Sequence, residues 1–270
     1  MLNASGWAAT FAVGFVLGLL GGGGSILIVP VLVYLFLFSA EQSTGLSLLV
    51  VGLSTLIGLF ASGAFKSVQI KTALTFALPS SLGAFLARKV LLPATPHMVG
   101  PLSRDTFLLV LFAALMLVVA YRMVRPEKAG LAGDSKPNGS LTLAELAKTS
   151  MIGLFVGMVA GYLGAGGGFL IVPALNQTLG LPMPLAIPTS LAIIAAQSLI
   201  GFTGAIGNTH VDWPFSIGLT AVAVAGLVTG TQFKSKVNPA KLKPAFGYFV
   251  LVTGVFILVQ ELVVKKAHTG

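Results

Sequence analysis

Charge is scarce in this sequence. Only 9% of the 270 residues are charged, whereas soluble domains carry about 25%. Hydrophobic residues make up 56% of the chain, and its mean hydropathy is +0.97. So few polar side chains cannot cover a globule in water, and the composition therefore excludes a soluble domain.

Cysteine is absent and histidine is rare. The missing thiols exclude disulfides and thiolate metal sites. The three histidines, His97, His210 and His268, are scattered and lack the spacing of metal ligands. No nucleophile motif and no phosphate-binding loop occurs in the sequence. We therefore expect no catalytic residues, no metal and no cofactor, and we do not expect an enzyme.

The sixteen Lys and Arg residues give the chain a net charge of +9, but they stand almost entirely at the ends of apolar runs. Cations at those places set the topology of membrane helices. No basic stripe with interleaved aromatic residues is present, so no nucleic-acid partner is expected. The first residues lack a basic region and a cleavage site, and 5–20 is therefore interpreted as mature protein rather than a signal peptide.

Long apolar runs fill almost the whole chain. They fall at about 6–20, 25–38, 43–63, 72–92, 106–122, 150–164, 168–180, 186–206, 214–232 and 244–264. A helix needs about 20 apolar residues to cross a hydrocarbon core of ~30 Å. The sequence predicts an all-α integral membrane protein that crosses the inner (cytoplasmic) cell membrane several times and is surrounded by its lipid bilayer.

A polar segment divides the chain into similar halves. Residues 125–148 contain Pro126, Pro137 and Gly139 among charged residues. We interpret this segment as a cytoplasmic linker between a first membrane repeat, 1–124, and a second membrane repeat, 149–270.

The two halves match each other at a constant offset of 143 positions, without a gap. Gly14, Gly18, Gly21, Gly23 and Gly24 match Gly157, Gly161, Gly164, Gly166 and Gly167, and Leu27-Ile28-Val29-Pro30 matches Leu170-Ile171-Val172-Pro173. Apolar residues coincide by chance in membrane proteins, so the glycine and proline matches carry the inference. They indicate an internal duplication.

The stretch 6–38 is too long for one crossing helix and contains a run of glycines. A continuous helix would be ~50 Å long at 1.5 Å per residue. Each glycine in a helix interior costs about 1 kcal/mol relative to alanine, so Gly21–Ser25 predicts a break between two short helices. Gly164–Gly168 predicts the equivalent break in the second repeat. Paired interruptions at corresponding places in two repeats indicate the binding site of a transporter.

The placement of cations predicts the topology. If each broken segment enters and leaves on one side as a hairpin, eleven cations lie on one side of the membrane and five on the other. A single crossing would give nine against seven, so the positive-inside rule favours the hairpin. Three full spans then follow each hairpin. The two repeats are therefore expected to be inverted, with both termini outside.

The breaks predict a site for a small anion. Helix starts present free N–H groups and the positive end of the helix dipole, and successive glycine amides can form a concave nest around an oxyanion. Hydroxyl and amide side chains on the following spans add donors. The predicted substrate-binding residues are Gly21, Gly22, Gly23, Gly24, Ser25, Ser47, Gly164, Gly166, Gly167, Gly168, Thr189, Ser190 and Gln197. This is a predominantly neutral cradle, from which an anion can leave quickly.

Packing is the competing interpretation of several of these features. Gly14-x-x-x-Gly18, Gly157-x-x-x-Gly161 and Gly226-x-x-x-Gly230 match the small-residue packing motif of membrane helices, and we expect them to pack helices. For Gln197, as for Ser54, substrate contact and a hydrogen bond that joins helices remain equally open.

The acidic residues bear on the driving force. None of the seven clearly lies within an apolar run, where the proton-carrying carboxylates of pumps are found. Glu261 comes nearest, but it stands close to a helix end, one turn before Lys265 and Lys266. We therefore expect movement down the anion's own gradient, or driven by the membrane potential.

The glycine run followed by Leu-Ile-Val-Pro, present in both halves, resembles the TauE/SafE sulfite-exporter family of membrane permeases. Pro188-Thr189-Ser190-Leu191 and Val211-Asp212-Trp213 extend the resemblance, which covers essentially the whole chain. In the first half, Gly45-Leu46-Ser47-Leu48 and Val68-Gln69-Ile70 depart from that pattern, which weakens any claim of two equivalent sites. The resemblance implies a secondary transporter or facilitator for a sulfur-containing anion such as sulfite, thiosulfate, sulfoacetate or a related organosulfonate.

An anion or ion channel built on the same glycine breaks is the alternative function, with glycine carbonyls as its filter. The lack of an acidic ring argues against a cation channel. A non-transporting scaffold would leave the duplicated breaks unexplained. The sequence carries no signal for the direction of transport or for the oligomeric state.

Overall fold

The computed structural model describes residues 4–124, 143–207, 211–233 and 239–264. In the first half the elements are α1 (Ala4–Leu20), η1 (Gly23–Leu27), α2 (Ile28–Pro30), η2 (Val31–Leu35), α3 (Ala40–Ala61), η3 (Ala64–Ser67), α4 (Ile70–Leu86), η4 (Ala87–Leu91), α5 (Leu92–Ala94), β1 (Met98–Val99), β2 (Leu102–Ser103) and α6 (Arg104–Val124). In the second half they are α7 (Leu143–Leu163), α8 (Gly168–Leu179), α9 (Met183–Ala205), α10 (Trp213–Phe233), α11 (Pro239–Val259) and η6 (Gln260–Val264).

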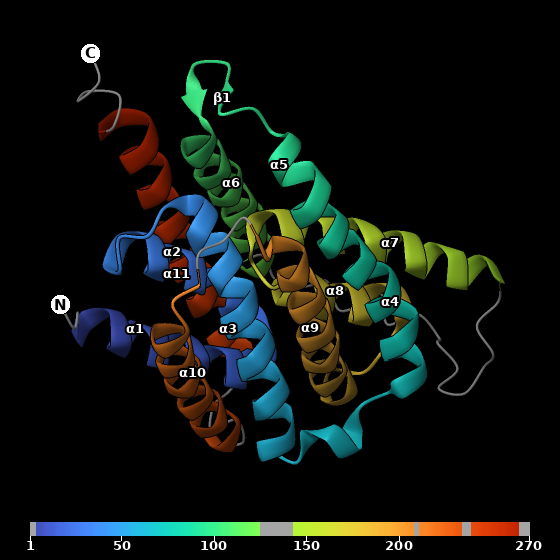
Figure 1. Ribbon diagram of the computed structural model, residues 1–270. Helices are drawn as coiled ribbons and strands as arrows, with labels where there is room; N and C mark the ends of the chain where they lie inside the picture. Colours follow the sequence, from blue (N-terminus) through green and yellow to red (C-terminus); the bar gives the residue numbers. More distant parts are fainter. Residues whose placement is uncertain (1–3, 125–142, 208–210, 234–238, 265–270) are drawn as a thin grey trace.

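Helices make up nearly all of the described chain, apart from the short antiparallel hairpin of β1 and β2 (Figure 1). Within the described residues, seven helices are long and apolar enough to cross a membrane. They are α3, α4 with its continuation through η4 and α5, α6, α7, α9, α10 and α11 with η6. The predicted all-α membrane class is confirmed.

Both predicted helix breaks are present. In the first half, α1 ends at Leu20 and a second helical coil runs from Gly23 to Leu35 through η1, α2 and η2. In the second half, α7 ends at Leu163 and α8 begins at Gly168. Three long helices follow each interrupted pair, as the sequence predicts.

The helix α7 is longer than expected. It begins at Leu143, inside the segment interpreted as a linker, and its 21 residues suffice to cross a membrane. Polar residues at its start, such as Glu145 and Lys148, conceal it in the hydropathy pattern. The linker residues 125–142 lie outside the described part of the chain.

Capping groups set several helix ends. The hydroxyl of Ser39 accepts a hydrogen bond from the backbone N–H of Gln42 at 3.3 Å, and α3 begins there. The carboxylate of Asp212 accepts one from the N–H of Phe215 at 3.2 Å at the start of α10. These acceptors satisfy N–H groups that have no partner within the helix. Gly180, with a left-handed φ of 61°, ends α8.

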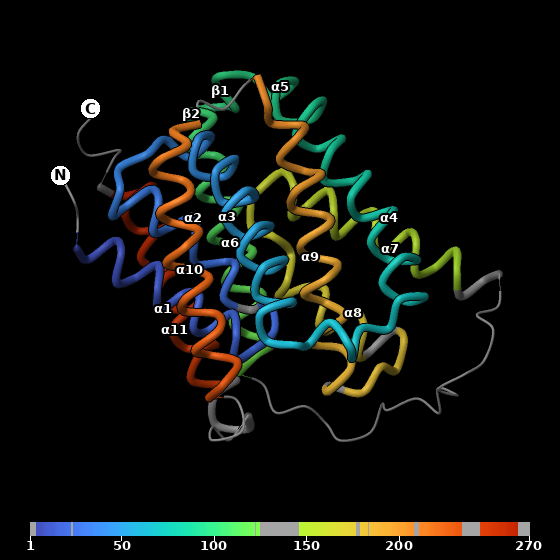
Figure 2. The backbone as a smooth tube through the Cα atoms, turned by 60° about the horizontal axis from the view of Figure 1, so that its bottom comes forward, coloured from blue at the N-terminus to red at the C-terminus, as the bar shows by residue number. Residues whose placement is uncertain are grey.

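The two halves of the chain are interleaved. Under the 143-residue offset, α1 corresponds to α7 and α4 to α10. In the structure α1 packs along α10, and α7 packs along α4, so each broken segment lies against a long helix of the other half. The equivalent helices α3 and α9 contact each other in the middle, and α6 contacts α11. Colours along α3 and α9 in Figure 2 run in opposite directions, so these two helices are antiparallel.

Glycines lie where α1 packs against α10 and where α7 packs against α4. A Cβ added at Gly14 would meet the carbonyl oxygen of Ala223, and one added at Gly157 would meet that of Ser80. Ala223 and Ser80 are themselves 143 positions apart, so the two contacts are equivalent. Backbones can approach this closely only where no side chain intervenes. The packing role expected for these glycine motifs agrees with their contacts.

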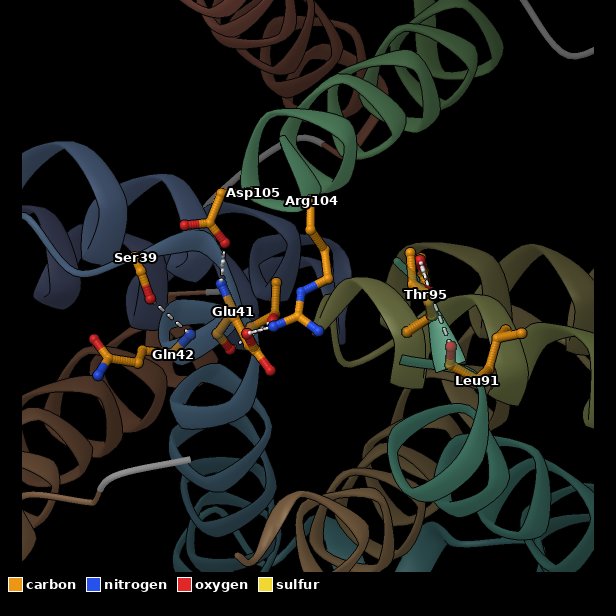
Figure 3. Close-up of polar contacts among 9 residues, drawn as sticks. Ser39, Glu41, Gln42, Leu91, Thr95, Arg104 and Asp105 are labelled. Atoms are coloured by element: carbon orange, nitrogen blue, oxygen red, sulfur yellow. Dashed lines mark hydrogen bonds and ion pairs between the residues drawn. The ribbon is translucent and has the colours of Figure 1, made fainter. Parts of the chain in front are cut away.

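Polar contacts join the starts of α3 and α6 at one end of the bundle (Figure 3). Arg104 Nη2 donates to Glu41 Oε2 at 2.5 Å, and Asp105 Oδ1 accepts from the backbone N–H of Glu41 at 3.3 Å. The side chains of the ion pair are 16% and 23% exposed, so we expect it to contribute only about 0–1 kcal/mol. Its effect is to hold the two helix starts in register.

Gly226 on α10 provides a test of the interleaved packing. A Cβ at Gly226 would lie 2.8 Å from the backbone nitrogen of Phe15 on α1, so Gly226→Ala must push α1 away from α10. We expect a loss of about 1–3 kcal/mol, the usual effect of overpacking, measured as a lower melting temperature in detergent. Gly218→Ala on the same helix is the matched control, because its Cβ would meet only the edge of the Trp7 ring, at 3.1 Å. Equal melting temperatures for the two variants would contradict the packing.

Candidate functional site

Glycines at both breaks adopt backbone conformations that other residues rarely reach. Gly21 and Gly22 have φ values of 69° and 139°. In the second repeat Gly164, Gly166 and Gly167 have φ values between 65° and 73°. Because glycine lacks a Cβ, it enters this region without steric penalty. The glycines therefore turn the chain between the two helices of each pair.

The two breaks meet in the interior of the protein. A Cβ added at Gly22 would lie 2.9 Å from the Cα of Gly168, and one added at Gly168 would lie 2.6 Å from the Cα of Gly22. Both glycines are buried. The starts of the two short helices are therefore in backbone contact, with their free N–H groups brought near each other.

Ser47 and Ser190 each form a hydrogen bond to the first residue of the break in the opposite repeat. Ser47 Oγ donates to the carbonyl oxygen of Gly164 at 2.5 Å, and Ser190 Oγ donates to that of Gly21 at 2.7 Å. Each hydroxyl also lies within hydrogen-bond distance of a carbonyl oxygen on its own helix, that of Thr44 at 2.9 Å for Ser47 and that of Ile187 at 2.8 Å for Ser190. Its single hydrogen is therefore shared between two carbonyls and is not free for a ligand. The two predicted substrate hydroxyls thus satisfy carbonyls left free where α1 and α7 end.

Ser25, Gly166, Gly167 and Gln197 lie together beside the second break. A Cβ at Gly166 would lie 3.4 Å from Ser25 Oγ, and one at Gly167 would lie 2.7 Å from Gln197 Nε2. Ser25 Oγ itself donates to the carbonyl oxygen of Gly22 at 2.9 Å. The structure thus brings these four predicted residues together at the second break.

Gln197 has unused hydrogen-bonding capacity. Its Nε2 donates to the carbonyl oxygen of Gly166 over 3.4 Å, near the upper limit for a hydrogen bond. Its Oε1 is buried and has no partner among the described residues, and the neighbouring Ser198 Oγ is in the same position. Buried polar groups are usually paired, so this side of α9 is suited to a polar ligand. The second hydrogen of Nε2 is the donor that an oxyanion can accept, whereas Oε1 can only accept a hydrogen bond.

Two of the predicted residues have other contacts. Gly24 packs on α1, since a Cβ there would lie 2.6 Å from the backbone nitrogen of Leu17. Thr189 Oγ1 accepts a hydrogen bond from the N–H of Gln69 at 3.0 Å, at the start of α4. For Gly23 only the backbone is described, as the first residue of η1.

Sequence reasoning missed a buried cation. Both Arg88 and Lys89 count there among the cations at the ends of apolar runs. The structure separates them: Lys89 is exposed, with Nζ 5.3 Å from the centre of the Phe85 ring, whereas Arg88 is 1% exposed. A usable signal exists, because Ser81, Ala84 and Arg88 follow the i, i+3, i+7 spacing of one helix face, and the first two are small and buried.

Glu261 stands near a helix end, as the sequence indicates, but its side chain is buried. It is 4% exposed and lies in the π-helical turn η6. Its Oε1 accepts from the hydroxyl of Tyr34 on η2 at 3.4 Å, and its Oε2 accepts from Thr106 Oγ1 on α6 at 3.1 Å. Glu261 thus joins the end of α11 to the first repeat. Among the residues whose burial is described, it and Arg88 are the buried charged side chains.

The described residues contain no cluster of three or more His, Asp or Glu side chains that could hold a metal ion. Three independent features of the site are instead polar and uncharged: glycine amides, serine hydroxyls and the Gln197 carboxamide. Amide N–H groups can bind an oxyanion, whereas the hydroxyl hydrogens of Ser25, Ser47 and Ser190 are already donated to backbone carbonyls.

Comparison with known proteins places this architecture in a family. Residues 7–257 match the family described as "Sulfite exporter TauE/SafE". The "Probable membrane transporter protein" of Xylella fastidiosa (strain Temecula1) is 32% identical over 250 residues, which cover 91% of each chain. "Probable membrane transporter protein YunE" of Bacillus subtilis (strain 168) is 28% identical over 237 residues, covering 83% of this chain and 86% of YunE. No solved structure matches the chain. Because the family match spans nearly all of its length, this multi-pass protein belongs to the TauE/SafE family of membrane transporters.

Proposed function

We propose that the protein is a secondary transporter or facilitator that moves a small sulfur-containing oxyanion across the cytoplasmic membrane. The observation that carries this proposal is the contact between two interrupted helices, one from each repeat, at Gly22 and Gly168. Interrupted helices that meet at the interface of two repeats are the usual site of substrate binding in secondary transporters.

The chemistry around the breaks favours an anion. The first amides of α8 and of the Gly23–Leu35 coil have no acceptor within their own helices, and the helix dipole is positive at these ends. Ser25 and Gln197 add polar side chains at the same place. The sulfur comes from the family description alone, and sulfite, thiosulfate, sulfoacetate and related organosulfonates are the substrates we propose.

The tight contact at the breaks favours a transporter over a channel. An open channel needs a continuous path, but the backbones of Gly22 and Gly168 touch without room for a side chain. Passage therefore requires the two interleaved halves to move apart, first on one side and then on the other. Saturable flux is expected from such a cycle, whereas a channel gives currents that rise steadily with concentration.

Gln197 provides a test of the site. In proteoliposomes, Gln197→Ala should raise the KM for labelled sulfite by about tenfold or more, the effect of losing one hydrogen bond to a charged ligand. Thr203→Ala is the control, because Thr203 lies on the same helix, is exposed and bonds only the carbonyl oxygen of Ile200. An unchanged KM in a folded Gln197→Ala protein would remove Gln197 from the site, and absence of saturable sulfite flux in the wild type would reject the function.

Glu261 provides a test of the driving force. If the anion moves down its own gradient or with the membrane potential, no proton carrier is needed, and Glu261→Gln should transport with the wild-type response to an imposed pH gradient. Glutamine keeps the size of Glu261 and one acceptor for Tyr34 or Thr106. The measurement is sulfite uptake with and without a pH gradient. A response present in the wild type and lost in Glu261→Gln would instead show that Glu261 carries protons.

The proposed orientation has inverted repeats, both termini outside and the linker in the cytoplasm. The cysteine-free chain allows a direct test. Ser67 in η3 and Met98 in β1 are exposed; Ser67 precedes α4, and Met98 follows α5, the end of its continuation. On intact cells, a maleimide that cannot cross membranes should label Met98→Cys and not Ser67→Cys, while both react after lysis. The reverse pattern would invert the topology.

A further inference from the structure

Arg88 is the largest side chain that the described part of the chain buries completely. It lies in η4, a π-helical turn, and π-helical turns occur often at functional sites. Its Nε donates to the carbonyl oxygen of Gly161 on α7 at 2.6 Å. On its other side, a Cβ added at Gly204 on α9 would lie 3.1 Å from Arg88 Cβ. Packing from two neighbouring helices therefore fixes the side chain.

The end of the guanidinium has no partner. Both Nη1 and Nη2 are buried and donate to no acceptor among the described residues. Arginine stays charged in proteins and has five N–H donors in a planar fork. Only the Nε–H is used here, so four donors and a full positive charge are left without an acceptor. Such a group is strongly unfavourable in a protein interior unless something pairs with it.

The protein's own acceptors are used elsewhere. Glu41 forms no ion pair with Arg88, and its carboxylate binds Arg104. The hydroxyl of Tyr162 shares a hydrogen bond with Thr95 Oγ1 at 2.9 Å. Glu261 binds Tyr34 and Thr106. The carbonyl end of α7 attracts a cation through the helix dipole. That attraction explains the bond from Nε to Gly161. It does not explain why Nη1 and Nη2 are buried without an acceptor.

Arg88 lies at the edge of the second break. Gly161 is in the last turn of α7, and Gly164, where the break begins, is three residues further on. The guanidinium is therefore bonded to the last turn of α7, three residues along the chain from the start of the second break. The 143-residue offset puts Thr231 at the corresponding position of the second repeat, where its hydroxyl donates to the carbonyl oxygen of Val228 at 2.7 Å. The other break thus has no equivalent cation.

We propose that Nη1 and Nη2 of Arg88 bind the transported oxyanion as a bidentate pair at the second break, an inference that rests on the proposed function. Two parallel N–H donors match two oxygens of a sulfite or sulfonate group, and such pairs are among the strongest hydrogen bonds in proteins. The anion supplies the charge that the buried guanidinium lacks. The site is then charged at one edge and not the neutral cradle expected from the sequence.

Thermal stability of the purified full-length protein in sodium sulfite tests this assignment, because a ligand that binds the folded form raises the melting temperature. Sulfite should stabilise the wild type and should leave Arg88→Met without a response. Without sulfite, Arg88→Met should melt no lower than the wild type, because an apolar side chain replaces an unpaired buried charge. Arg88→Lys keeps the charge but loses the fork, and its half-saturating sulfite concentration should rise by about tenfold or more.

Lys89→Met is the matched control, since Lys89 lies in the same turn but is exposed over the Phe85 ring. It should respond to sulfite as the wild type does. The same half-saturating concentration in Arg88→Met as in the wild type would show that water satisfies the guanidinium, and would overturn this inference while leaving the proposed function in place. If Arg88→Met does not fold, Arg88→Lys takes its place: a half-saturating sulfite concentration equal to that of the wild type would overturn the inference. A wild type that responds to none of sulfite, thiosulfate or sulfoacetate would overturn both.

Discussion

Backbone N–H and C=O groups that leave a helix inside a bilayer must find partners within the protein, because lipid offers none. In this fold each repeat supplies those partners to the other. Ser190 on α9 pairs the carbonyl oxygen of Gly21, and Ser47 on α3 pairs that of Gly164. The glycine breaks also rest on each other at Gly22 and Gly168. An interrupted helix is therefore tolerated here only because the second repeat is present.

The packing of α1 against α10 and of α7 against α4 also joins each interrupted helix to the other half of the chain. The long helices α10 and α4 pack along α1 and α7, the first helix of each interrupted pair, and hold them in place. Glycines at these contacts bring backbones together without side chains between them, as at Gly14 and Gly157. The surface between the two halves thus contains both the anchoring contacts and the proposed anion site.

The helices and breaks of the two halves correspond to each other, whereas several polar side chains near the breaks do not. Gln197 corresponds to Ser54, whose hydroxyl bonds the carbonyl oxygen of Val51 on its own helix. Glu261 corresponds to Val118, which is exposed. Arg88 has Thr231 as its counterpart. The predicted duplication accounts for the paired glycines and serines at the breaks, whereas the polar groups suited to a ligand gather at one break.

The sequence by itself determined the membrane class and the position of both breaks, because hydropathy and the preference of glycine for turns are local properties. The duplication stays a prediction from the glycine and proline matches. The tertiary structure decided which polar groups are free for a ligand. Ser47 and Ser190 look like substrate hydroxyls in the sequence, but their bonds span 117 and 169 residues to carbonyls of the other repeat. Arg88 and Glu261 look like helix-end charges, yet they are buried in π-helical turns against neighbouring helices. Which face of a helix turns inward depends on the partner it meets, and no local pattern contains that partner.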